Sequence, residues 1–428
     1  MSAGGDAPSR LARRLGTADA VVIGLGSMIG AGVFAAFAPA ARAAGNGLLI
    51  GLAIAGLVAY CNATSSAQLA AVYPESGGAY VYGRRRLGEL WGFVAGWGFV
   101  VGKLASCAAM AMTFASHVAP SLARPLAIAA VLALTAVNCL GVQKTAAVTR
   151  FLVAAVLASL LIVIAAVWLG GAAQPARLWP VEGTSLRGVL TSAGLLFFAF
   201  AGYARVATLG EEVREPERTI PRAIPIALAI ALAVYVAVAV SALAGAGAGA
   251  IAASSMPLAT AVEAGRLAWL APAVRVGAAL ASLGVLLSLI AGVGRTLFAM
   301  AVSRDMPRYL SAVHPRYQVP HRAELTAGAV VAVAVAMADI RSAIGFSSFA
   351  VLAYYAVANA AAWTLPREQR RWPRALSALG AAGCVGLAFS LPLESVAAGA
   401  SVLGGGVLVY LLVRLLVRLR RPSAPPAP

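Results

Sequence analysis

The chain has 428 residues, of which 61% are hydrophobic and only 11% are charged. The core of one soluble domain cannot bury that much apolar surface, so the composition indicates an integral membrane protein. The net charge of +18 would suggest nucleic acid binding in a soluble protein. Here the basic residues gather at alternate ends of the apolar runs, which the positive-inside rule explains without nucleic acid.

Long apolar runs follow one another along the chain and predict an all-α membrane protein with about twelve transmembrane helices. In chain order the runs are 20–41, 47–72, 90–118, 125–141, 151–169, 188–209, 223–246, 272–301, 325–338, 343–365, 375–391 and 395–416. The ninth run is the shortest of them. One transmembrane unit, 19–421, is therefore expected between a cytoplasmic segment, 1–18, and a Pro-rich tail, 422–428, whose composition is typical of disorder.

The orientation follows from the loops. Lys and Arg concentrate in the loops on the side of the N-terminus, so both termini are predicted to be cytoplasmic. The heavy use of Ala, Arg and Gly is typical of a GC-rich bacterial genome, which indicates a bacterial cytoplasmic membrane.

The first span holds four glycines between Gly24 and Gly32. Each glycine costs a helix roughly 1 kcal/mol relative to alanine. Backbone that unwinds inside a membrane is tolerated where it lines a cavity, and the N–H groups that begin the next half-helix form an anion site. The same glycines also fit close packing of helices through small residues.

A second interruption is the sequence Phe-Phe-Ala-Phe-Ala-Gly-Tyr at 197–203, in the sixth span. We expect two repeats of five helices each, at 20–169 and 188–365, followed by two extra helices at 375–416. The second interruption then takes the same place in the second repeat as the glycines take in the first. Interrupted helices in matching positions of two halves point to the substrate site of a transporter.

Two cations fall inside predicted spans. Lys103 is deep in the third span, where an ammonium costs at least ~2.5–3.5 kcal/mol on insertion scales, so it should face a cavity or lose its proton. It is interpreted as a proton carrier or fixed functional charge, or else as a structural cation bonded to carbonyls at a helix break. Arg205, near the cytoplasmic end of the sixth span, is expected to form an inner-gate salt bridge with Glu211 or Glu212 rather than to bind substrate.

No Asp or Glu falls deep inside a predicted span, which favours a zwitterionic, largely neutral substrate over a cationic one. The three histidines have no other ligand type nearby, so no metal or other cofactor is predicted. The spans offer no catalytic set of side chains, so the chain is not expected to be an enzyme.

Four stretches carry a family resemblance: 23–34, Tyr-Pro-Glu-Ser-Gly-Gly-Ala-Tyr at 73–80, 197–225 with its Gly-Glu-Glu-Val-Arg-Glu-Pro core, and 295–320. Through them the chain resembles the amino acid–polyamine–organocation (APC) superfamily of permeases, nearest to the bacterial relatives of cationic amino acid transporters. The resemblance runs from about residue 19 to residue 365.

The resemblance implies the LeuT-type fold, a five-plus-five inverted repeat followed by two further helices. It implies that the substrate α-carboxylate meets backbone N–H groups of the first break, at Met28, Ile29, Gly30, Ala31 and Gly32. It implies that the α-ammonium meets carbonyls on both sides of the site, at Ile23, Gly24, Phe198, Ala199, Phe200 and Ala201. Phe200 would be the aromatic gate beside the substrate, with Tyr203 as a weaker candidate.

The chain departs from the family pattern in three places. Ala31 stands where many relatives have Ser or Thr, so the carboxylate would depend on backbone donors. Ala204-Arg205 stands where many have residues of the Phe-Asp-Ala type. Val156 lies near the position where proton-coupled relatives have a lysine, which makes Lys103 the candidate replacement.

Together these features predict secondary active transport of an amino acid by alternating access, with symport of H⁺ rather than Na⁺. An amino acid exchanger, an amine or polyamine permease of the same fold, and a non-transporting amino acid sensor stay open as alternatives. The expected partners are the amino acid, protons and membrane lipids, and the sequence leaves the oligomeric state open.

Overall fold

The computed structural model describes residues 15–74, 77–141, 146–179, 184–207 and 213–419. Apart from an isolated bridge between Leu15 and Val213, the regular structure of these residues is helical. The α-helices are α1 (Thr17–Met28), α2 (Ala31–Ala35), α3 (Phe37–Ala44), α4 (Leu48–Val72), α5 (Ala79–Leu87), α6 (Glu89–Val118), α7 (Ala123–Cys139), α8 (Ala146–Leu169), α9 (Leu186–Phe200), α10 (Ala204–Ala207), α11 (Pro216–Ala253), α12 (Pro257–Glu263), α13 (Ala271–Val302), α14 (His321–Met337), α15 (Ile340–Trp363), α16 (Arg374–Ser390) and α17 (Leu393–Leu419). The predicted all-α class is confirmed.

Ten helical segments among the described residues are long and apolar enough to cross a membrane. α14 and α16 have 17 residues each, which makes them about 25 Å long, shorter than a hydrocarbon core of roughly 30 Å. They coincide with the ninth and eleventh predicted runs. Every predicted run therefore has a helix, while the total of twelve crossings stays a prediction.

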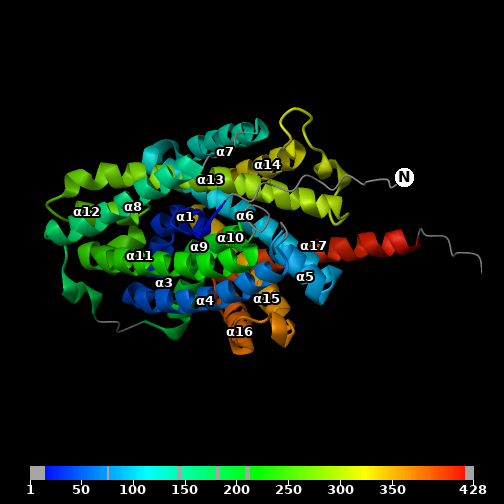
Figure 1. Cartoon of the computed structure of the whole chain (residues 1–428). Helices are drawn as coiled ribbons and strands as arrows, with labels where there is room; N and C mark the ends of the chain where they lie inside the picture. Colours follow the sequence, from blue (N-terminus) through cyan, green and yellow to red (C-terminus); the bar gives the residue numbers. More distant parts are fainter. Residues whose placement is uncertain (1–14, 75–76, 142–145, 180–183, 208–212, 420–428) are drawn as a thin grey trace, which may run out of the picture.

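The long helices pack side by side. α11 packs along α1 and α4, and α4 packs along α9. α6 packs along α13 and α15, α14 packs along α7 and α13, and α15 also contacts α4 and α9. α1, α9 and α10 lie in the middle of the molecule (Figure 1). The two interrupted spans are thus enclosed by other helices, which is where a membrane tolerates irregular backbone.

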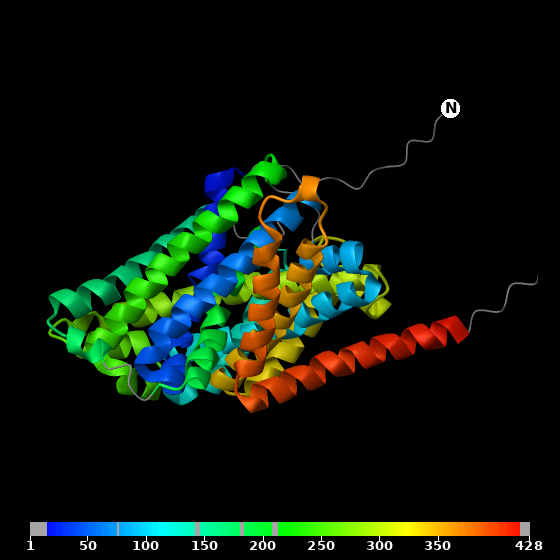
Figure 2. The same cartoon turned by 90° about the horizontal axis from the view of Figure 1, so that it is seen from below.

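α6 and α17 show the two extremes of membrane environment. α6 is the most enclosed of the ten spans, and it holds buried polar side chains such as Lys103, Ser106 and Thr113. α17 lies at the edge of the molecule (Figure 2, red) and has mostly exposed apolar side chains. Lipid is the natural neighbour of such a surface, so the polar side chains of a functional site are expected on α6 rather than on α17.

Candidate functional site

The first predicted break is present in the backbone. α1 ends at Met28, and Ile29 (φ −79°, ψ 66°) and Gly30 (φ −122°, ψ −149°) leave helical geometry before α2 begins at Ala31. The Gly30 N–H donates to the Met28 carbonyl at 2.8 Å, which closes a tight turn. Because the first N–H groups of a helix lack intrahelical acceptors, the start of α2 offers donors to a ligand.

The second break follows α9. That helix ends at Phe200, and a 3₁₀ turn, η4 (Ala201–Tyr203), separates it from α10. Arg205 is half-buried in α10. Glu211 and Glu212 lie outside the described residues, so the inner-gate salt bridge stays a prediction.

The two breaks touch each other through glycines. A Cβ atom on Gly202 would lie 2.1 Å from the carbonyl oxygen of Ser27 and 2.6 Å from the nitrogen of Met28. A Cβ atom on Gly32 would lie 2.9 Å from the Cα of Ala199. All three distances are shorter than the Cβ contacts found in proteins, so only glycine permits the two segments to approach this closely. The glycines therefore serve the helix break and the close packing at once.

Tyr235 of α11 bridges the two breaks. Its hydroxyl lies 2.6 Å from the Met28 carbonyl oxygen and 2.9 Å from that of Ala199. A hydroxyl carries one proton, so it donates to one of the two carbonyls at a time. The ring of Phe200, fully buried, packs edge-on against Tyr235 with 5.0 Å between centroids, whereas Phe198 keeps 8% of its surface exposed. Tyr235 holds the ends of α1 and α9 together.

Lys103 lies at the second break. Its side chain is 6% exposed, and its ammonium donates to the Ala201 carbonyl at 3.2 Å. The hydroxyl of Tyr355 donates to the same carbonyl at 3.5 Å, and the ring of Tyr203 stacks on Tyr355 at 5.0 Å. The hydrogen bond from Lys103 to a carbonyl fits the interpretation as a structural cation. Its position beside the second break fits the interpretation as a proton carrier.

Ile23 and Gly24 lie inside α1 rather than in the turn. The Ile23 carbonyl accepts a bond from the Ser27 hydroxyl at 2.9 Å. A Cβ on Gly24 would lie 2.9 Å from Val206 and 3.1 Å from Ala227, so this glycine packs against α10 and α11. Their role in ammonium binding stays a prediction.

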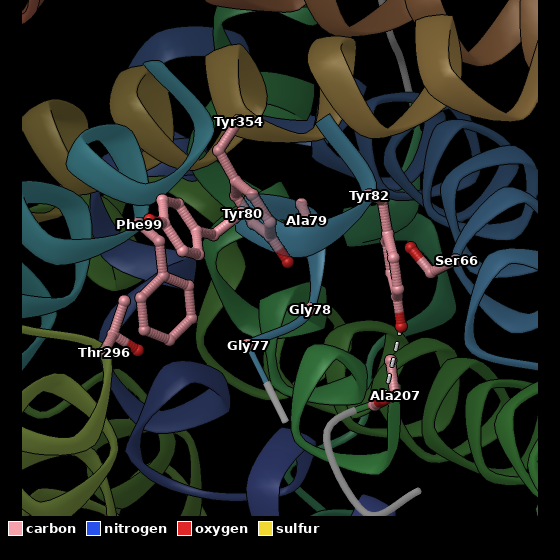
Figure 3. A pocket seen from close by; sticks show the side chains of 10 residues that line it. All are labelled: Ser66, Gly77, Gly78, Ala79, Tyr80, Tyr82, Phe99, Ala207, Thr296 and Tyr354. Atoms are coloured by element: carbon pink, nitrogen blue, oxygen red, sulfur yellow. Dashed lines mark hydrogen bonds between the residues drawn. The ribbon is translucent and has the colours of Figure 1, made fainter. Parts of the chain in front are cut away.

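A narrow cavity lies between the second break and α5 (Figure 3). It is lined by Ser66, Gly77, Gly78, Ala79, Tyr80, Tyr82, Phe99, Ala207, Thr296 and Tyr354. Phe99, one helical turn from Lys103 on α6, meets Tyr354 edge-on at 5.8 Å, and Tyr354 contacts Tyr355 at 4.1 Å. Phe99 and Tyr354 therefore line the cavity, and Tyr355 connects Tyr354 to the Ala201 carbonyl that also accepts from Lys103.

The other wall of the cavity joins α5 to α10. Tyr82 is buried, and its hydroxyl donates to the Ala207 carbonyl at 3.4 Å, the dashed line in Figure 3. α5 itself is anchored to the end of α15, because Arg86 donates to the hydroxyl and the carbonyl of Thr364. Tyr82 therefore joins α5 to α10, and Arg86 joins α5 to the end of α15.

A charged cluster that the sequence did not reveal fixes α5. The Asp305 side chain is 1% exposed and accepts bonds from Tyr80 and Arg84, both at 2.8 Å. Glu89 pairs with Arg84 at 3.0 Å and also with Arg414 of α17. Burial raises the pKa of Tyr80 to about 12. The cluster ties α5, α6 and α17 to the segment after α13.

Glu324 was also missed. It lies in the first turn of α14, is 3% exposed, and its Oε2 has no hydrogen-bond partner among the described residues. A Cβ on Gly294 of α13 would lie 2.6 Å from its Cγ, so the two helices enclose the side chain. The ninth predicted run begins one residue later, at 325, so the sequence predicts that Glu324 lies in the preceding loop.

The sequence pattern of the amino acid permease family matches residues 15–417. The chain belongs to this family. An uncharacterised transporter of Mycobacterium tuberculosis is 61% identical over 418 residues, which are 98% of this chain and 95% of that protein. A branched-chain amino acid permease of Bacillus subtilis is 26% identical over 435 residues (96% of this chain, 92% of that protein). A chloroplastic cationic amino acid transporter of Arabidopsis thaliana is 27% identical over 386 residues (82% of this chain, 65% of that protein).

These similarities confirm the predicted superfamily and the prediction of a transporter rather than an enzyme. Its described residues include ten helices long and apolar enough to cross a membrane, so the permease is a multi-pass membrane protein, and its family transports amino acids. The residues that bind substrate stay predictions.

Proposed function

We propose that this permease carries a zwitterionic, largely neutral amino acid across a bacterial cytoplasmic membrane by alternating access, coupled to protons. The proposal rests on the backbone contact between the two breaks, where Gly202 meets the Ser27–Met28 peptide. Gly32 of α2 also lies against Ala199 of α9, so the first turn of α2 and the end of α9 are neighbours. Donors suit an α-carboxylate and carbonyls suit an α-ammonium, which are the two groups that all amino acids share.

The charge at the site supports a neutral side chain on the substrate. The residues proposed to bind the substrate are uncharged, and Lys103 beside them is itself a cation. Nothing at the site would therefore balance the positive charge of a cationic side chain on the substrate. The relatives' names leave the choice open, since one is named for branched-chain and another for cationic amino acids. The chemistry of the breaks therefore favours leucine-like substrates over arginine-like ones.

Lys103 is the proposed proton carrier. It is a buried cation that can titrate, and it bonds to the carbonyl of Ala201 at the second break. Arg205 keeps its proton at all physiological pH values and cannot serve. Val156, near the position where proton-coupled relatives have a lysine, is apolar and buried.

Counterflow tests the substrate class. Liposomes containing the protein would be preloaded with leucine, and the entry of labelled leucine measured with isoleucine, arginine or glutamate outside, against protein-free liposomes. We expect isoleucine to compete and the two charged amino acids not to compete. Competition by arginine alone would overturn the assignment of a neutral substrate. Binding of leucine without any entry would favour a sensor.

A further inference from the structure

A second cavity, polar and about 300 Å³ in volume, lies where α1 and α11 begin. It is lined by Gly16, Thr17, Arg214, Glu215, Arg218, Thr219 and Arg222. The chain segments before the two helices are joined here, because the Arg214 N–H donates to the Leu15 carbonyl at 2.9 Å. The buried hydroxyl of Thr219 donates to the Arg214 carbonyl at 2.6 Å. One backbone and one side-chain hydrogen bond therefore fix the walls of the cavity.

The lining carries an excess of positive charge. Glu215 is its one acidic residue, and it pairs with Arg218 at 3.2 Å. Within the part of the chain that the structure describes, neither Arg214 nor Arg222 has an ion-pair partner. Asp19, the nearby acid on α1, is paired with Arg150 at 2.5 Å. Arg214 interacts electrostatically with Asp19, but among the described residues neither Arg214 nor Arg222 forms an ion pair of its own.

The charges at this end of α11 favour a bound anion. Arg218 and Arg222 lie in the first two turns of α11, where the helix dipole favours anions, and Glu217 is the acidic residue of the first turn. The spacing of four residues between Arg218 and Arg222 adds a like-charge repulsion. The positive-inside rule accounts for basic residues on this side, but any loop position would satisfy it. An anion inside the cavity would interact favourably both with the helix dipole and with the arginine side chains that line the cavity.

We propose that this cavity binds a phosphate-bearing anion through Arg214 and Arg222, beside the N-terminal ends of α1 and α11. Guanidinium groups match phosphate oxygens with paired, charge-assisted hydrogen bonds. α1 and α11 both continue from the cavity as membrane spans, so a phospholipid headgroup and a free phosphate compound have access. A bound anion would tie the half-helix before the first break to α11, and its occupancy is expected to restrain the start of α1.

Thermal unfolding with two probes tests the proposal and separates the two sources. The purified protein in phosphatidylcholine nanodiscs would be titrated with inorganic phosphate at constant ionic strength, and compared with nanodiscs that contain phosphatidylglycerol. A ligand that binds the folded protein raises the unfolding temperature. A saturable rise with phosphate assigns a free anion, and a rise only with phosphatidylglycerol assigns the lipid headgroup.

The matched variants are R214Q/R222Q and R367Q/R371Q, which remove the same charge inside and outside the cavity. We expect half-saturation to weaken about tenfold in R214Q/R222Q and to be unchanged in R367Q/R371Q. If the double variant does not fold, R222Q alone replaces it, since Arg222 is exposed. An equal effect in both double variants, or no response of the unmodified protein to either probe, would overturn the proposal.

Discussion

A single methyl group at position 202 tests whether the two breaks meet as the structure shows. The Cβ of Gly202→Ala would lie 2.1 Å from the Ser27 carbonyl oxygen, and Cβ contacts under 3.0 Å are essentially never found. The two segments would have to separate by about 1 Å, since packed interiors offer no spare volume. The atoms in the way belong to the backbone and cannot rotate aside. Overpacking of this kind costs ~1–3 kcal/mol.

The assay is uptake of labelled leucine by liposomes, together with the unfolding temperature of the purified variant. Gly202→Ala should therefore lower the unfolding temperature and reduce uptake, because the two segments that form the proposed site can no longer meet as they do in the structure. Gly386→Ala in α16 is the control, since its Cβ meets no atom within 4 Å among the described residues. It should keep full uptake, with a helix up to about 1 kcal/mol more stable. Normal uptake and stability of Gly202→Ala would refute the contact between the breaks.

Three further substitutions have defined outcomes. Lys103→Met should leave a folded protein whose leucine uptake no longer responds to a pH gradient; a retained response would exclude Lys103 as the proton carrier. Tyr235→Phe removes one hydrogen-bond donor that two carbonyls share, and the Met28 carbonyl keeps its bond from the Gly30 N–H, so a loss of about 0.5–1.5 kcal/mol should lower the unfolding temperature and weaken half-saturation by leucine. Asp339→Ala removes the N-cap of α15, in which the carboxylate accepts from the Ser342 N–H at 2.7 Å, and should cost about 1 kcal/mol in thermal unfolding. That bond holds the pKa of Asp339 below its usual value. The unmodified protein should therefore exceed Asp339→Ala in unfolding free energy by the whole amount at neutral pH, and this excess should vanish as the pH falls through the lowered pKa.

The helices could be located from the sequence because length and polarity alone decide whether a segment suits lipid. The first break could be placed because the glycines between Gly24 and Gly32 weaken the helix locally. Tyr235 could not be found in this way. It is an ordinary aromatic residue in an apolar run, and its role comes from the packing of α11 against both breaks, which only the folded structure reveals.

The two acidic residues show a different limit. Glu324 was missed because a charged residue at the edge of an apolar run is normally assigned to the loop, whereas α14 begins three residues earlier, at His321. Asp305 lies in a loop of the sequence, and its burial depends on Arg84, which is 221 positions away. Burial of a carboxylate by partners distant in the chain leaves no local pattern to detect.

The central claim is that the chain moves a neutral amino acid through the two breaks with a proton. The most direct test is uptake of labelled neutral amino acids by liposomes containing the protein, with an inward proton gradient and no sodium. We predict accumulation above the external concentration, abolished by a protonophore and absent from protein-free liposomes. No uptake, even with amino acids preloaded inside for exchange, would contradict this account.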